Sequence, residues 1–347
     1  MKILLLAAIA FLAGCAGLQS LSSAPGALLQ SGKATGLMPH YVQHPVHTDH
    51  GRSWMLPQKK GAKGALIYTG DEENNDVYVY DYSSGKAVGT LTGFDEPYGG
   101  CVDAKGDVYI TNYGAGTVVE YAHGGTKVID TYDSGGTPVG CSVDSKGDVA
   151  VTSFDPGEAV VFAGGNPKKG AAYNGGACTY LWSMGYDHSG NLIGVGETSS
   201  GGRCYAGLLS GAKSISSLSF SGTIDFPGGT MWDGKYIALG DQEAGGTFNT
   251  GLYRATLKGS TLSPVGSEVT LTDCSDEYND IIRPFIVGKK NTPVNDQQGK
   301  VVIGTNQWTT QGNQSCPHGI EFWHYPQGGN PFKGEGSETV LAVSIGT

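Results

Sequence analysis

Carboxylate and aromatic side chains occur together in the glycine-rich segments of this sequence, and both residue types can build a binding site. The densest group is DCSDEYNDIIR, from Asp273 to Arg283. Carboxylate oxygens suit Ca²⁺, a hard cation that takes about six to eight oxygen ligands, whereas aromatic rings suit the stacking of a sugar or a peptide. The predicted calcium ligands of this kind are Glu96, Glu197, Asp241 and Asp276, and the predicted ligand-binding aromatics are Tyr98, Tyr113, Tyr180, Trp182, Tyr278 and Trp308.

The same residues have a simpler interpretation, in which acidic loops keep the protein soluble and aromatic rings fill gaps between strands. Histidine offers a third kind of chemistry, zinc binding or general-base catalysis by a lyase. HYVQHPVHTDH carries four histidines between His40 and His50. His318, beside Cys316, is the histidine best placed to lie on the same face of the protein as the acidic loops. The sequence lacks the G-x-S-x-G, H-E-x-x-H, P-loop and dinucleotide motifs, which disfavours serine hydrolases, zincins and nucleotide enzymes.

The elements that must position these residues are short strands in a repeated pattern. PYGGCVDAKGDVYITNYGAGTVVEY begins at Pro97, and PVGCSVDSKGDVAVTSFDPGEAVVF begins at Pro138. Each contains a strand ending in Asp, a tight Lys-Gly-Asp turn and two further strands, followed by a weaker fourth. Asp103 and Asp144 are 41 residues apart, and the pattern returns at Asp187 and Asp233.

Repeats of this length with four strands each are typical of a β-propeller. We predict an all-β fold, a six-bladed β-propeller of four-stranded antiparallel blades over residues 45–347, with seven blades as the alternative. RSWMLP (52–57) is predicted as the first strand of the first unit, and ETVLAVSI (338–345) as the fourth strand of the last.

The motif P-x-G-x-x-V-D-x-x-G-D-V-Y-I-T resembles NHL-type repeats and the six-bladed group that includes SMP-30/gluconolactonase-like proteins, over residues 95–195. The lactonase-like members hold a divalent metal near the axis with Glu, Asn and Asp. The resemblance therefore implies metal ligands at Asn112, Glu197, Asp241 and Asn306, which end second strands. The Glu-Gly-Pro signature of that family is absent, since DEPYGG keeps only Glu96 and Pro97.

Six cysteines besides Cys15 form an even set, which predicts disulfides in an exported chain. Cys178 and Cys204 occupy two loops on one face of a unit, and Cys274 and Cys316 occupy the same two loops of the last unit. Cys101 and Cys141 lie on first strands of neighbouring blades. Aligned by the Asp they are one residue out of step, so they point to opposite faces of their sheets and toward each other. We predict the pairs 101–141, 178–204 and 274–316, with free buried thiols as the alternative.

The first fifteen residues, MKILLLAAIAFLAGC, predict a secretory signal that ends in a bacterial lipobox. Residues 1–14 would be removed, Cys15 would be lipidated, and residues 15–44 would form a flexible tether. The expected location is the cell envelope, on the outer membrane or its periplasmic face. A membrane held through the lipid at Cys15 is one expected partner.

The net charge of −10 argues against a nucleic-acid partner, because phosphate binding needs a basic surface. The favoured function is a monomeric binding or scaffold module for an envelope protein, a glycan or a small molecule. Calcium is the one cofactor that the sequence suggests. A metal-dependent lactonase-like hydrolase and a propeller lyase are the alternatives.

Overall fold

The computed structural model describes residues 41–43, 51–56, 64–72, 74–246, 250–272, 285–288, 300–306, 319–331, 333–336 and 342–346. The chain divides into two units, residues 1–33 and 34–347, of which the first lies outside the described residues. The described part of the second unit is almost entirely β, with two short 3₁₀ turns, η1 (Ala163–Gly165) and η2 (Ala244–Gly246).

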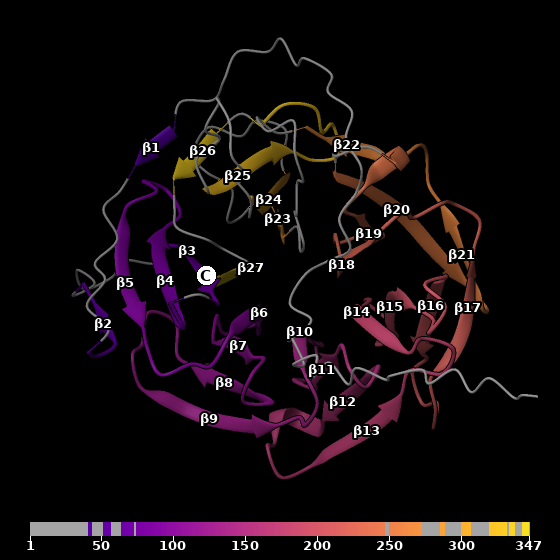
Figure 1. Cartoon of the computed structure of the whole chain (residues 1–347), viewed down its shortest axis with the longest axis horizontal. Coiled ribbons are helices and arrows are strands. Elements are labelled where there is room, and N and C mark those ends of the chain that lie inside the picture. The colour runs from indigo at the N-terminus through magenta and orange to yellow at the C-terminus, as the bar shows by residue number, and fades with distance from the viewer. Residues whose placement is uncertain are drawn as a thin grey trace, which may run out of the picture. The chain divides into compact units, whose positions relative to one another are not determined.

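Six antiparallel blades of four strands each contain all the described strands except β1, β2 and β22, as the sequence predicts (Figure 1). From the inner to the outer strand, blade 2 contains β6 (Pro97–Val102), β7 (Val108–Asn112), β8 (Thr117–Tyr121) and β9 (Val128–Asp133). Blade 3 contains β10 (Pro138–Val143), β11 (Val149–Ser153), β12 (Glu158–Phe162) and β13 (Gly170–Asn174). Blade 4 contains β14 (Tyr180–Tyr186), β15 (Leu192–Glu197), β16 (Arg203–Leu208) and β17 (Ser216–Phe220).

The remaining blades carry additional short strands. Blade 5 contains β18 (Pro227–Trp232), β19 (Ile237–Asp241), β20 (Thr250–Lys258) and β21 (Thr261–Pro264), with β22 (Val269–Leu271) on the first half of β20. Blade 6 contains β23 (Phe285–Gly288), β24 (Lys300–Asn306), β25 (Gly319–His324) and β26 (Lys333–Gly336), with β1 (Tyr41–Gln43) parallel to β26. Blade 1 contains β27 (Ala342–Gly346), β3 (Leu66–Asp71), β4 (Asp76–Asp81) and β5 (Ala87–Leu91), with β2 (Trp54–Met55) outside β5.

The ring closes differently from the sequence prediction. The last strand, β27, pairs with β3 and is the inner strand of blade 1, so RSWMLP is not the first strand of the first unit. Its residues Trp54 and Met55 form an outer strand instead, and the fourth strand of blade 6 is the glycine-rich β26. The predicted tether also contains β1 at its end. Pairing the last described strand with the first blade closes the ring of blades.

Contacts between inner strands run around the whole ring, from β27 to β6, β10, β14, β18, β23 and back to β27. The apolar core lies between the blades, because the second strands of blades 1 to 5 are buried on both faces. In β7, Val108 and Ile110 pack toward blade 1 while Tyr109 packs toward blade 3. Each hydrophobic cluster of the described residues joins two neighbouring blades.

The repeated Asp explains the tight turn after the inner strands of blades 2 to 5. Oδ1 of Asp103 accepts hydrogen bonds from the backbone N–H of Lys105 at 2.8 Å and of Asp107 at 3.0 Å. Asp144 makes the same two bonds in blade 3, at 2.8 and 2.9 Å. Gly106 has a φ of 89°, a left-handed conformation that glycine adopts without steric cost. We call the side with these turns the lower face and the opposite side the upper face.

Candidate functional site

The last residue of each second strand lies at the upper face and occupies an equivalent position in every blade. These residues are Asp71, Asn112, Ser153, Glu197, Asp241 and Asn306. Asn112 Oδ1 accepts a hydrogen bond from the backbone N–H of Asp95 at 2.6 Å, and Ser153 Oγ accepts one from Thr137 at 3.0 Å. At three of the positions, those of Asn112, Ser153 and Asp241, the side chain therefore holds the loop that leads into its own blade.

Asp241 makes the strongest contacts of this kind. It is fully buried, and its carboxylate accepts the backbone N–H groups of Asp225 at 2.7 Å, Phe226 at 2.9 Å and Glu243 at 3.0 Å. Burial raises the pKa of Asp241, and the three N–H donors act against that rise. In Asn112 and Asp241, side-chain oxygens that the sequence predicts as metal ligands accept hydrogen bonds that order loops.

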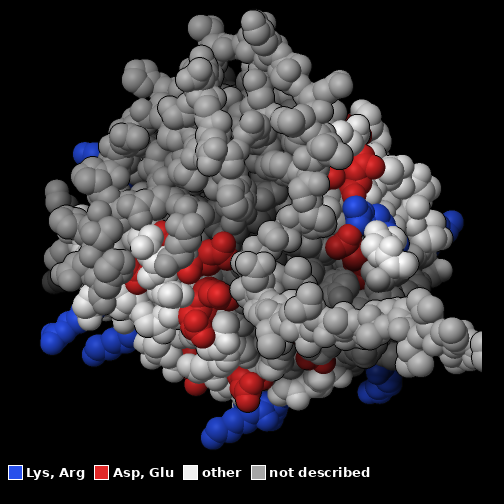
Figure 2. Space-filling model, in the orientation of Figure 1, with Lys and Arg blue, Asp and Glu red and all other residues white. Residues whose placement is uncertain are grey.

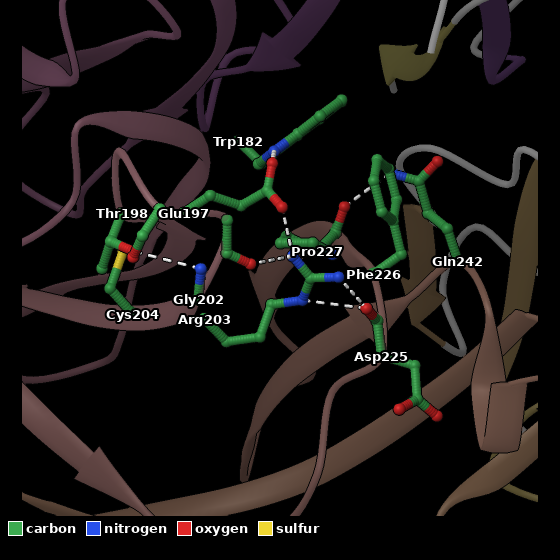
Figure 3. Close-up of polar contacts among 12 residues, drawn as sticks. Trp182, Glu197, Thr198, Gly202, Arg203, Cys204, Asp225, Phe226, Pro227 and Gln242 are labelled. Carbon is green, nitrogen blue, oxygen red and sulfur yellow. Dashed lines mark hydrogen bonds and ion pairs between the residues drawn. The ribbon is translucent and has the colours of Figure 1, made fainter. Parts of the chain in front are cut away.

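Glu197 departs from this pattern. Its carboxylate accepts the indole N–H of Trp182 at 3.2 Å and forms an ion pair with Arg203 (Figure 3). The Arg203 guanidinium also donates to the backbone carbonyl oxygen of Asp225, which lies in the loop before the first strand of blade 5. The side chains of Glu197 and Arg203 are 18% and 26% exposed, so the pair lies at the surface of the upper face.

A β-bulge near the start of β14, the inner strand of blade 4, brings the aromatic side chain of Trp182 beside Glu197. The pairing of β14 with β15 shifts between Leu181 and Ser183, which places Trp182 in the bulge. The pairing of β6 with β7 shifts between Pro97 and Gly100 in the same way, with Tyr98 in that bulge. Bulges redirect side chains beside functional sites, and equivalent shifts occur in β10 and β18.

The upper-face aromatics form a continuous row across blades 3 to 5. Phe154 stacks on Tyr180 with ring centroids 5.0 Å apart and meets Trp182 edge-on at 5.0 Å. Trp182 meets Phe226 edge-on at 5.0 Å, and the Arg203 guanidinium lies 5.5 Å from the Phe226 centroid. We call Phe154, Tyr180, Trp182 and Phe226 the aromatic row. Its four residues are half-buried, so part of each ring stays accessible.

Tyr98 and Tyr113 form a separate pair, with centroids 5.6 Å apart. Glu96, which precedes this pair, is exposed and has a φ of 54°, a strained conformation for a residue with a β-carbon. Its backbone N–H is held by Asn75 Oδ1 at 2.7 Å. The loop that carries Glu96 is therefore ordered by a neighbouring blade.

Carboxylates gather around this face. In Figure 2, Asp and Glu atoms lie toward the middle of the visible surface, and most Lys and Arg atoms project from its edge. Near the aromatic row, burial raises the pKa of Glu243. Burial, with the carboxylates of Asp241 and Asp225, raises the pKa of Glu268 to about 7.

The raised pKa of the Glu268 carboxyl predicts that the stability of the folded protein depends on pH. Since its pKa rises from 4.5 to about 7 on folding, the folded protein keeps this proton where the unfolded chain has lost it. The contribution to stability is complete below pH 4.5 and disappears as the pH rises through 7. The thermal midpoint of the wild type is thus expected to rise relative to that of Glu268→Gln as the pH falls from 8 to 5. A difference between the two proteins that does not change with pH would contradict this assignment.

Most of these groups are among the residues that the sequence predicts for the site, but Arg203 is not. A single arginine between Glu197 and Cys204, among acidic loops, was the available signal. Other predicted site residues, namely Asp276, Tyr278, Trp308, His318, Cys274 and Cys316, lie outside the described residues. Asn306 ends β24, and its backbone pairs with Gly319.

Two of the predicted disulfides are present. Cys101–Cys141 joins β6 to β10 in neighbouring blades, with Cα atoms 5.5 Å apart. The strand register shows the predicted offset, because Cys101 is one residue before Val102 whereas Cys141 is two before Val143, and both valines pair with the first residue of a second strand. Cys178–Cys204 ties the loop before β14 to β16 of the same blade.

The described residues contain no group of three or more His, Cys, Asp or Glu side chains placed to hold a metal ion. The calcium site therefore stays a prediction. Within the same residues, no helix is long and apolar enough to cross a membrane.

The ring of blades and the upper-face site define this protein as a six-bladed β-propeller. No protein-family model and no curated protein matches the chain by sequence. A structure of a nidogen/laminin complex shows the same fold, with a TM-score of 0.58 and 12% identity over 82% of this chain and 99% of that one. The chain is also similar to hydrazine synthase of Kuenenia stuttgartiensis (TM-score 0.48, 14% identity, 81% and 80% of the two chains). A virginiamycin B lyase from Staphylococcus aureus gives a TM-score of 0.46 and 11% identity over 77% and 79%.

Proposed function

We propose that this propeller is a lipid-anchored binding or scaffold module of the cell envelope, which takes a protein, glycan or small ligand on its upper face. The aromatic row is the observation that carries the proposal. Four rings from three blades lie in contact and half-exposed, beside an Arg203–Glu197 pair. Large rigid rings lose little conformational entropy on binding, which makes them good anchors for a ligand.

The anchor and the family assignment belong to the same proposal. The lipobox ending at Cys15 supports attachment to a membrane through acyl chains. The Asp-x-Lys-Gly-Asp turns of blades 2 and 3, with their matching hydrogen bonds, support a relation to the NHL-repeat and SMP-30/gluconolactonase-like group. Negative charge on the protein favours an uncharged or cationic ligand over an anionic one.

Replacing Trp182 with alanine tests the binding face. Trp182 contacts two other members of the row and Glu197, so its loss is expected to weaken ligand retention at least ten-fold. The measurement is retention from solubilised envelope extract and on a glycan array. Phe220→Ala is the matched control, because Phe220 lies on the outermost strand of the same blade and packs on Tyr205 and Tyr253. Equal loss in both variants would rule out the aromatic row as the binding face.

The hydrolase alternative is decided in the same preparation. A panel of lactones is incubated with the protein, with and without a chelator. Turnover that stops when the chelator is added would replace the binding function with metal-dependent catalysis. Absence of turnover under both conditions would leave the binding function as proposed.

A further inference from the structure

A cavity of about 490 Å³ lies at the lower end of the inner strands of blades 2 to 5, apart from the aromatic row. Its walls come from the second halves of β6, β10, β14 and β18 and from the turns that follow β10 and β14. Small-molecule sites in proteins have volumes of roughly 300–1,000 Å³. The cavity is therefore large enough for one small organic ligand.

Part of the wall is apolar and aromatic. Trp232 lines the cavity and stacks on the imidazole of His188, with ring centroids 4.9 Å apart and an angle of 30° between the planes. Met231 and the Cys101–Cys141 disulfide add polarisable sulfur atoms to the same wall. This surface favours a ligand with an aromatic or other polarisable body.

The charge of the cavity is negative. Asp144 and Asp187 line it, whereas no lysine or arginine of the described residues does. Oδ1 of Asp144 is used by two backbone N–H groups of its own turn. Oδ2 of Asp144 lies 3.9 Å from the place that a β-carbon on Gly190 would take, so it points toward the neighbouring turn of blade 4. The hydrogen bonds to the Asp144 carboxylate from described residues all go to Oδ1 and leave Oδ2 without one.

We propose that this cavity binds a small organic ammonium ion with an aromatic body. The ammonium group would lie against Oδ2 of Asp144, with Asp187 adding negative charge to the same cavity, and the aromatic body would contact Trp232 and Met231. Attraction of a cation to an aromatic face adds to its attraction to the carboxylates. The site is independent of the function proposed for the upper face, since no residue of the aromatic row lines it.

Three ligands of matched size test the charge preference on the full folded chain. Phenethylammonium carries a positive charge, 2-phenylethanol is neutral and 3-phenylpropionate is negative. Isothermal titration calorimetry at pH 8 and low ionic strength is expected to show phenethylammonium binding at least ten-fold more tightly than the other two. Its affinity is expected to fall when salt is added, because part of the attraction is between exposed charges. Equal affinities, or no binding of phenethylammonium at millimolar concentration, would overturn the proposal.

The repeat supplies a matched pair of variants. Asp103 holds the turn of blade 2 with the same two hydrogen bonds as Asp144 but does not line the cavity. Asp144→Asn is expected to weaken phenethylammonium binding about five-fold, while Asp103→Asn leaves it within two-fold of the wild type. A loss of affinity in Asp103→Asn as large as in Asp144→Asn would contradict the site. If Asp144→Asn fails to fold, the three-ligand comparison on the wild type decides alone.

Discussion

Replacing Asp241 with alanine is expected to lower the free energy of unfolding by about 4 kcal/mol. Removal of a buried carboxylate that accepts several hydrogen bonds leaves each of its donors without a partner. Asp241 is fully buried and holds the N–H groups of Asp225, Phe226 and Glu243. Loss of that carboxylate also releases the loop carrying Phe226. Urea denaturation followed by tryptophan fluorescence measures the effect.

Ser153→Ala is the control for this experiment. Ser153 occupies the equivalent position in blade 3 and is also fully buried, but its hydroxyl accepts a single N–H, from Thr137. Its loss is expected to cost about 1 kcal/mol, the usual contribution of one neutral hydrogen bond. An equal effect of the two substitutions would show that the three bonds of Asp241 do not cooperate in holding the loop.

Removing the disulfide between blades 2 and 3 is expected to lower stability by a similar amount. The bridge joins residues 40 apart in sequence, and on the chain-entropy account closing a loop of that length stabilises the fold by about 4 kcal/mol. The double variant Cys101→Ala/Cys141→Ala is compared with the wild type by urea denaturation without reductant. Both residues lie in the apolar cluster between the two blades, so alanine keeps the packing apolar.

The second bridge provides the comparison for the first. Cys178–Cys204 spans 26 residues within one blade, and its removal is expected to cost slightly less, about 3.5 kcal/mol. Loss of less than about 1 kcal/mol in Cys101→Ala/Cys141→Ala would mean that the interface between the blades holds without the bridge. A loss much larger than 4 kcal/mol would mean that the bridge also positions the blades.

The candidate site was partly predictable from the sequence. Tyr98, Tyr180 and Trp182 were identified because they flank strands whose upper ends the repeat locates. The roles of the second-strand residues were not predictable, since Asn112 and Asp241 each have the right atoms for a metal. Only the position of the loop backbone shows that these atoms accept N–H groups. The role of Arg203 is not predictable, because its partners lie 6 residues away at the end of β15 and 22 residues away in the loop before β18.

By itself the sequence determined the strands, the turns and the offset of Cys101 and Cys141, because the period of two along a strand and the turn chemistry of Asp and Gly act over a few residues. Tertiary structure decided the closure of the ring by β27, which pairs with β3 across more than 270 residues of chain. It also decided that Glu197 meets Arg203 and Trp182. These contacts depend on which blades become neighbours, and many short strands of similar pattern could pair equally well until the whole ring packs.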